Sequence, residues 1–206
     1  MRLSRMKPNQ SSPQARRDLV SQQELHKTIE RLFSASRGTD GKLTERVLYR
    51  RDGIVVLIQS ITAPDWATHK RIYPDYHSEQ PITKEINPQF VSDQVWLYKC
   101  RVNPSRLGKS PEGKPHYNGI YYAEAQIEWW LASTAKRGFK VLSATTNPDR
   151  WEFKGSRRRI TMAVGTFCGF LQVTDASIFS KTFQKGIGKG KAFGLGLLSI
   201  FPGERK

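Results

Sequence analysis

The sequence is poor in cysteine, in long apolar runs and in acidic residues. Its two cysteines, Cys100 and Cys168, allow one disulfide at most and cannot form a zinc site alone. No stretch approaches the ~18 apolar residues of a membrane helix, so no membrane span is expected. Residues 1–7 carry charges but no apolar core, which argues against a signal peptide. We therefore expect a soluble protein of the reducing cytoplasm.

The scarcity of acidic residues gives the chain a strong positive charge. Its 206 residues include 34 Lys and Arg against 18 Asp and Glu, a net charge of +16. Residues 1–37 carry +5 and residues 136–206 carry +10, so the surplus lies at the two ends. Such concentrated charge is typical of a protein that binds a polyanion, most often nucleic acid. The alternatives are basic solvated faces or, more weakly, an anionic membrane surface, for which no basic amphipathic helix stands out.

The first half of the chain alternates between strand and helix patterns. Residues 1–7 read as a strand, and Ser21 to Glu24 form a capping box that opens a helix. The apolar stripe of that helix comprises Leu25, Ile29, Leu32 and Phe33. Two β-rich runs meet at Asp52-Gly53, a hairpin signal. Four prolines interrupt residues 62–92, where no helix is predicted, and residues 95–102 read as a strand.

The second half repeats this alternation without a leading strand of its own, which residues 103–115 or a shared connection over 97–102 could supply. The predicted elements are a helix over 121–137, a strand over 139–146, a hairpin over 151–165 that turns at Gly155-Ser156, a strand over 167–173, a helix over 176–185 and a strand over 195–201. The fold class is therefore α+β, with two tandem ferredoxin-like (βαββαβ, RRM-like) domains and a basic cleft. The predicted domains are residues 1–103 and 116–206, joined by a Pro- and Gly-rich linker over 104–115.

A glycine-rich segment is the most specific feature. Residues 186–196 hold five glycines and two lysines directly after a predicted helix. Glycines let backbone N–H groups approach a phosphate closely, and lysines add charge. The segment is not a Walker A loop, because it precedes a strand and lacks the Gly-Lys-Ser/Thr ending. The candidate RNA-binding residues here are Gly186, Gly188, Lys189, Gly190, Lys191 and Phe193; the alternative is a flexible loop with a helix-capping glycine.

Two further candidates lie elsewhere. The predicted hairpin carries the basic residues Lys154, Arg157, Arg158 and Arg159, which can follow the phosphates of an RNA groove or protect an exposed strand edge. His26 borders the apolar stripe of the first helix and can act as a general acid or base near neutral pH, or simply be a packed side chain. The spacing of His69 and His77 fits no standard metal site, so no metal and no cofactor is expected.

The sequence resembles the repeat-cleaving endoribonucleases of the type I-E CRISPR system, the CasE subunit of the Cascade complex. Four stretches carry the resemblance: Leu3 to Met6, Arg17 to His26, Arg101 to Pro104, and Gly186 to Ser199. Residues 169–175 fit as well, and the resemblance covers essentially the whole chain. It implies two ferredoxin-like folds in tandem, in agreement with the element pattern.

The resemblance also implies an activity. The family binds the stem-loop of the CRISPR repeat and cuts precursor RNA at the 3′ base of the stem without a metal. The ribose 2′-OH attacks the adjacent phosphate and leaves a 2′,3′-cyclic phosphate. In the family pattern the catalytic histidine falls on His26, and the basic hairpin and the glycine-rich segment contact RNA. The implied partners are precursor and mature repeat RNA and other Cascade subunits, and the isolated chain is expected to be a monomer.

One departure from the family pattern bears on this activity. Many members place a tyrosine three residues before the histidine, where this sequence has Gln23. An amide cannot transfer a proton at neutral pH. Either His26 works with a lysine such as Lys27 or Lys191, or cleavage is slower or lost. The leading hypothesis is an endoribonuclease that stays on its product and therefore turns over about once. The alternatives are a cleavage-deficient RNA-hairpin-binding subunit of the same complex and a general ferredoxin-like RNA-binding module.

Overall fold

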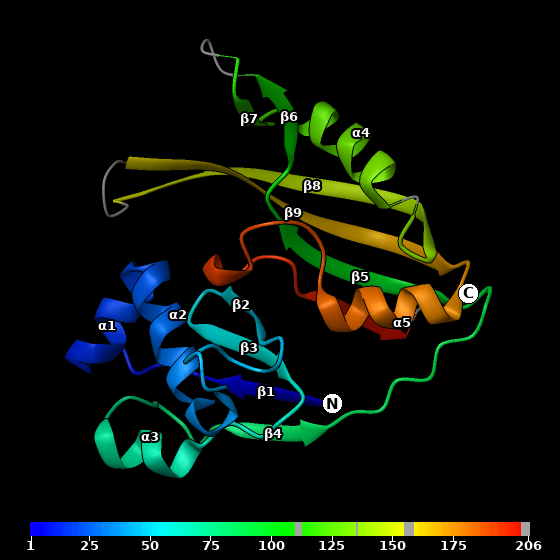
Figure 1. Cartoon of the computed structure of the whole chain (residues 1–206). Coiled ribbons are helices and arrows are strands. Elements are labelled where there is room, and N and C mark those ends of the chain that lie inside the picture. The colour runs from blue at the N-terminus through cyan, green and yellow to red at the C-terminus, as the bar shows by residue number, and fades with distance from the viewer. Residues whose placement is uncertain (110–112, 135, 155–158, 203–206) are drawn as a thin grey trace. The chain divides into compact units, whose positions relative to one another are not determined.

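The computed structural model describes residues 1–109, 113–134, 136–154 and 159–202, which form two compact units (Figure 1). The first unit comprises Met1–Pro88 together with Lys191–Leu197. The second comprises Gln89–Gly190 and Leu198–Lys206. The chain therefore crosses between the units three times, and each unit is described by itself.

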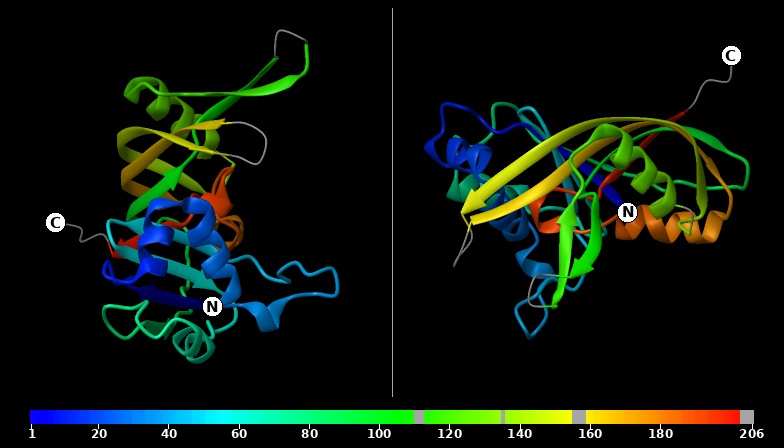
Figure 2. Two further views of the ribbon diagram at one scale, coloured as in Figure 1. Left: turned by 90° about the vertical axis from the view of Figure 1, so that its left-hand side faces the viewer. Right: turned by 90° about the horizontal axis from the view of Figure 1, so that it is seen from above.

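The first unit is a four-stranded antiparallel sheet with the strand order β2-β3-β1-β4. Helices α1 and α2 lie against one face of this sheet (Figures 1 and 2). Its elements are β1 (Arg2–Met6), α1 (Pro13–Val20), α2 (Gln22–Arg31), the 3-10 turn η1 (Ser34–Ser36), β2 (Leu48–Asp52), β3 (Val55–Ser60), α3 (Trp66–Ile72), β4 (Ile82–Glu85) and the 3-10 turn η2 (Lys191–Phe193).

The core of the first unit joins α1 and α2 to the sheet. The predicted stripe of α2 is confirmed, because Leu25 and Ile29 are buried against Met6 of β1 and Val56 of β3. The capping box is also confirmed, since the Ser21 Oγ accepts a hydrogen bond from the Glu24 backbone N–H at 3.3 Å. These contacts fix the rotation of α2 about its axis and hence the direction of its polar side chains.

The second unit contains its own four-stranded antiparallel sheet with the order β10-β5-β9-β8. A separate two-stranded ribbon, β6 with β7, is inserted between β5 and α4. The elements are β5 (Val95–Val102), β6 (Ser105–Lys109), β7 (Pro115–Gly119), α4 (Ala123–Thr134), β8 (Phe139–Lys154), β9 (Arg159–Val173), α5 (Ala176–Lys185) and β10 (Leu198–Pro202).

Each unit follows the βαββαβ order, with its first and third strands at the centre of the sheet. The predicted α+β class with tandem ferredoxin-like folds is therefore confirmed. The hairpin at Asp52-Gly53 and the helix over 176–185 also lie where the sequence predicted them.

Three local predictions need correction. The strand over 95–102 was placed in the first predicted domain, but β5 pairs with β9 and β10 in the second sheet, as the alternative for residues 97–102 allowed. The strand that closes the first sheet is β4. The proline-broken region also contains α3, which begins where the Asp65 side chain accepts a hydrogen bond from Thr68 N. The predicted linker over 104–115 contains β6, whose backbone pairs with β7. The predicted domain boundaries therefore shift to residues 88 and 89, and residues 191–197 return to the first unit.

The first unit is closed by the packing of residues 191–197 on β2. Tyr49 of β2 is 1% exposed, and its hydroxyl donates a hydrogen bond to the Ala192 carbonyl oxygen at 2.8 Å. Gly194 has a φ of +77°, and a Cβ there would lie 2.8 Å from the Tyr49 ring. Glycine is needed at position 194 both for its backbone conformation and for this close approach.

A pair of glycine substitutions tests this packing. Gly41 of the same unit has a φ of +74° but would place a Cβ in open space. Both Gly→Ala changes carry the backbone strain, whereas only Gly194→Ala collides with Tyr49. We expect Gly194→Ala to lower the free energy of unfolding by about 1–3 kcal/mol more than Gly41→Ala, measured by urea denaturation. Equal losses in the two variants would contradict the packing described.

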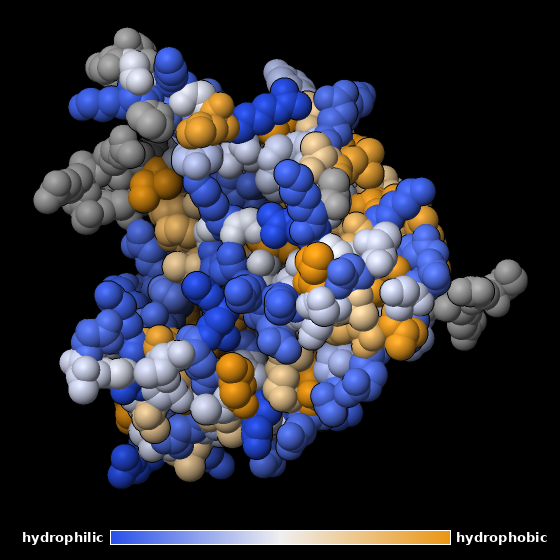
Figure 3. Space-filling view, turned by 45° about the vertical axis from the view of Figure 1, so that its right-hand side comes forward, coloured by the Kyte–Doolittle hydropathy of each residue, from blue (hydrophilic) through white to orange (hydrophobic). Residues whose placement is uncertain are grey.

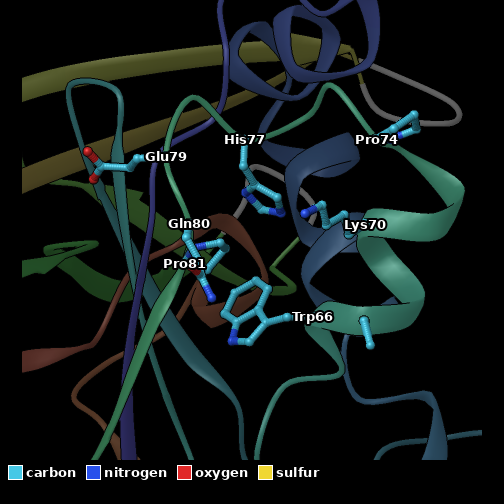
Figure 4. Close-up of a pocket in the computed structure, with 8 residues that line it drawn as sticks. Trp66, Lys70, Pro74, His77, Glu79, Gln80 and Pro81 are labelled. Atoms are coloured by element: carbon cyan, nitrogen blue, oxygen red, sulfur yellow. The ribbon is translucent and has the colours of Figure 1, made fainter.

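The buried His69 of α3 meets the half-buried His77. His69 is 4% exposed, and its Nδ1 lies 3.0 Å from Nε2 of His77 in a hydrogen bond. Burial lowers the pKa of each to about 4, and their mutual repulsion adds to the effect at His69. Figure 4 shows His77 facing a pocket of about 520 Å³ beside Trp66 and Lys70. The pair is therefore neutral at physiological pH.

This pair makes the first unit sensitive to acid. The folded pKa values lie below the ordinary value of about 6.5, so the unfolded state binds more protons and stability is lost as pH falls from about 6.5 toward 4. Between pH 7.5 and 5 we expect a loss of about 2 kcal/mol for each such histidine. We would measure the free energy of unfolding by urea denaturation at the two pH values. His77→Gln should lose less stability between them than the wild type, and the exposed His116→Gln should lose as much as the wild type. If His77→Gln lost as much stability as the wild type, the acid sensitivity would not come from this pair.

In the view of Figure 3, hydrophobic residues are scattered among hydrophilic ones. Within the described residues, no helix is long and apolar enough to cross a membrane.

Candidate active site

His26 lies on α2 at the border of the apolar stripe, as predicted. Leu25 is fully buried, and the next side chain along the helix, His26, keeps 32% of its surface exposed. The helix thus presents the imidazole at the surface of the first unit while its neighbours anchor it in the core. A side chain placed in this way can meet a ligand without leaving its helix.

The ring of Tyr49 supports the His26 imidazole. The two rings are stacked, with centroids 6.2 Å apart and planes 17° from parallel. Because the Tyr49 hydroxyl is bonded to Ala192 of η2, this tyrosine connects the histidine to the end of the glycine-rich segment. Burial raises the pKa of Tyr49 far above its ordinary value, so its phenol stays protonated as a donor.

Glu30 provides the charge nearest to His26. Its Oε1 lies 3.4 Å from the His26 Nε2, one helical turn away, and its Oε2 lies 3.3 Å from Arg37. Burial lowers the pKa of His26, and the Glu30 carboxylate opposes this by favouring the imidazolium. Burial is the larger effect, so the imidazole is neutral at physiological pH and free to accept a proton.

The two candidate lysines are placed differently. The Nζ of Lys27 lies 2.7 Å from the Glu24 Oε1, in an ion pair on α2 that directs it toward the N-terminus of the helix. Lys191 is the first residue of η2, a turn that contacts α2 within the first unit. Lys191 precedes Ala192, whose carbonyl oxygen accepts the hydrogen bond from Tyr49, whereas the Lys27 side chain is directed toward Glu24. Gln23 is half-buried on α2, about one turn before His26.

The glycine-rich segment is divided between the two units. Gly186 ends α5 with a φ of 71°, and its N–H donates a hydrogen bond to the Thr182 carbonyl oxygen. Gly186 is therefore the helix-capping glycine that was the alternative to a phosphate-binding role. Gly188 and Gly190 also adopt positive φ values, 76° and 80°, in the second unit. The exposed Lys189 places its Nζ 2.9 Å from the ring centroid of Tyr117. Phe193 lies in η2 of the first unit, half-buried.

The basic hairpin is described only in part. Lys154 ends β8 and Arg159 begins β9, and their backbones pair directly. Arg157 and Arg158 lie outside the described residues. The two arms are much longer than predicted, because the separate strands expected over 139–173 join into two continuous strands.

Sequence reasoning missed Tyr49 and Glu30. Glu30 carries a signal that could have been used, since an acidic residue four positions after a helical histidine faces it. Tyr49 carries none, because its partner Ala192 is 143 residues away in the chain. In the described ranges, no cluster of three or more His, Cys, Asp or Glu side chains is suited to hold a metal ion.

Comparison with known proteins gives full-length matches. The CRISPR-associated endoribonuclease Cse3 of Thermus thermophilus is 29% identical over 227 residues, which cover 98% of this chain and 100% of that protein. The structure of Thermus thermophilus Cse3 bound to an RNA representing a pre-cleavage complex matches with a TM-score of 0.82 at 28% identity over 98% of each chain. Cas6e from Escherichia coli K-12 shares the fold, with a TM-score of 0.70 and 22% identity over 98% of this chain and 100% of that one.

A family model covers nearly the whole chain. The model described as CRISPR associated protein matches residues 1–202, which include both sheets and the His26–Tyr49 pair. The resemblance noted in the sequence is thereby confirmed, and this chain belongs to the CRISPR associated protein family.

Proposed function

We propose that this protein is a metal-independent endoribonuclease that cleaves precursor CRISPR RNA at the 3′ base of the repeat stem. The observation that carries the proposal is the half-exposed, neutral His26, stacked on Tyr49 in a chain that resembles the Cse3 endoribonuclease over its full length. Cleavage of RNA by its own 2′-OH needs a base, an acid and charge stabilisation, and no redox chemistry.

The chemistry assigns one proton transfer to His26. The 2′-oxygen forms a bond to the adjacent phosphorus while the bond from phosphorus to the 5′-oxygen breaks. The 5′-oxygen takes up a proton from water, so the products are a 2′,3′-cyclic phosphate and a 5′-hydroxyl. Because its imidazole is neutral at physiological pH, His26 can serve as the base that takes the 2′-OH proton. Lys27, next to His26 on α2, and Lys191, on the turn that contacts α2, are the two candidates to stabilise the phosphorane charge.

The RNA-binding surface in this proposal comprises charged and glycine-rich segments. These are the hairpin residues Lys154, Arg157, Arg158 and Arg159 and the loop residues Gly186, Gly188, Lys189 and Gly190, together with Phe193. Charge-assisted contacts to phosphates hold the stem, and the product stays bound after cleavage. We further propose that the protein acts in the cytoplasm and remains on the mature RNA as a subunit of a Cascade complex.

A cleavage assay on labelled repeat stem-loop RNA in EDTA tests the catalytic assignment. We expect the wild type to cut the RNA once per enzyme, and His26→Ala to be slower by at least about 100-fold, because a general acid–base group contributes that much. A 2′-deoxy substitution at the scissile nucleotide should block cleavage completely. Lys42→Ala removes a positive charge from an exposed side chain of the same unit and should cut normally.

Two outcomes would contradict the proposal. Normal cleavage by His26→Ala would remove this residue from the reaction. Binding without cleavage by the wild type would establish the cleavage-deficient subunit instead. In that case Gln23→Tyr, which restores a phenol one turn before His26, would test whether the amide at that position causes the loss.

A further inference from the structure

The second unit has a groove whose walls are β7 and the distal half of β9. Two adjoining pockets, of about 390 and 480 Å³, open along this groove. Both are lined by His116, Tyr117 and Gly119 of β7 and by Thr161 of β9. None of these residues has a role in the cleavage proposed above.

Each pocket has an aromatic ring with a cation beside it. The Lys189 Nζ lies 2.9 Å from the Tyr117 centroid, and the Arg150 Cζ lies 5.5 Å from the Tyr121 centroid. Tyr117 is 49% exposed and Tyr121 is 37% exposed, so both rings keep surface free for a ligand. Aromatic faces for the bases and cations for the phosphates are the two elements of single-stranded nucleic acid sites.

Polar side chains in the same pockets can read the edges of a base. Asn103 lines one pocket, Asn118 lines the other, and Thr161 lines both. Amides and hydroxyls both donate and accept hydrogen bonds, as the Watson–Crick edge of an unpaired base requires. The lining thus combines stacking surfaces with adaptable hydrogen-bonding groups.

The groove is held in place by the fold. The Trp129 indole N–H of α4 donates a hydrogen bond to the Ser105 carbonyl oxygen of β6 at 3.0 Å, which fixes the ribbon on the helix. At the other end of the ribbon, a Cβ on Gly119 would lie 2.9 Å from the Ala163 Cβ, so β7 approaches β9 as closely as backbone allows. A ligand would therefore meet a site already formed, with little ordering cost.

We propose that this groove binds two consecutive unpaired nucleotides that flank the repeat stem, one base in each pocket. The inference rests on the RNA-binding function proposed above and adds a substrate class, single-stranded RNA, to the stem-loop. An unpaired base offers the free face that stacking on Tyr117 or Tyr121 needs, whereas bases within a duplex are stacked on each other. Lys189, already at the Tyr117 ring, supplies charge for the phosphate between them.

Binding of two RNAs tests this inference. One is the repeat stem-loop with unpaired flanks on both sides, blocked by 2′-deoxyribose at the scissile position, and the other is the same stem-loop without flanks. Affinities are measured by fluorescence anisotropy at one salt concentration, because RNA binding depends strongly on salt. The variants are Tyr117→Leu and Tyr121→Leu, with Tyr117→Phe keeping the ring. Tyr122→Leu is the matched control, since Tyr122 is 79% exposed and lines neither pocket.

We expect each Leu variant to bind the flanked RNA about tenfold more weakly than the wild type and to bind the blunt stem-loop normally. Tyr117→Phe and the Tyr122→Leu control should bind both RNAs like the wild type. If the Leu variants lost the same affinity for both RNAs, the groove would bind the stem. If they bound the flanked RNA normally, the groove would not bind RNA. Either result overturns this inference and leaves the proposed function standing. A wild type that binds neither RNA would overturn the proposed function as well.

Discussion

The hydrogen bond from the Tyr49 hydroxyl to the Ala192 carbonyl oxygen is the contact on which the candidate active site depends. It joins β2, in the first quarter of the chain, to a turn near its end. The tyrosine is buried, and its hydrogen bond to the Gln22 carbonyl oxygen is longer, at 3.5 Å, so losing the bond to Ala192 would cost about 1 kcal/mol. The same ring forms the surface on which His26 stacks. One side chain thus closes the first unit and sets the surroundings of the candidate catalytic group.

The electrostatics of His26 follow from this packing. Burial against Tyr49 disfavours the imidazolium, and Glu30 compensates only in part. Arg37 in turn pairs with Glu30 and holds its carboxylate on that side of α2. The result is an imidazole that starts neutral but has a carboxylate ready to stabilise the charge it gains. A group that must take up a proton during a reaction and release it afterwards needs both properties.

Local patterns in the sequence predicted most elements but not the long-range contacts. The capping box at Ser21, the hairpin at Asp52-Gly53 and the final helix each depend on neighbours in the chain, and all three were correct. The strand β4 was missed, because four mostly exposed residues between prolines carry no period-2 pattern.

His26 was found through its place on a helix, whereas Tyr49 was not, because only the folded chain brings it to Ala192. The glycine-rich segment was recognised as a unit, yet the fold divides it: Gly186 caps α5, Lys189 reaches Tyr117, and η2 packs near His26.

The central claim is that burial on Tyr49 keeps His26 neutral while Glu30 favours its protonated form. The most direct test is an NMR titration of the His26 ring in the full-length protein, repeated in Glu30→Gln. The account predicts a pKa below the ordinary histidine value of about 6.5 in the wild type, and a lower one in Glu30→Gln, because the variant removes the carboxylate that favours the imidazolium. A wild-type pKa at or above 6.5, or a value that Glu30→Gln leaves unchanged, would contradict it.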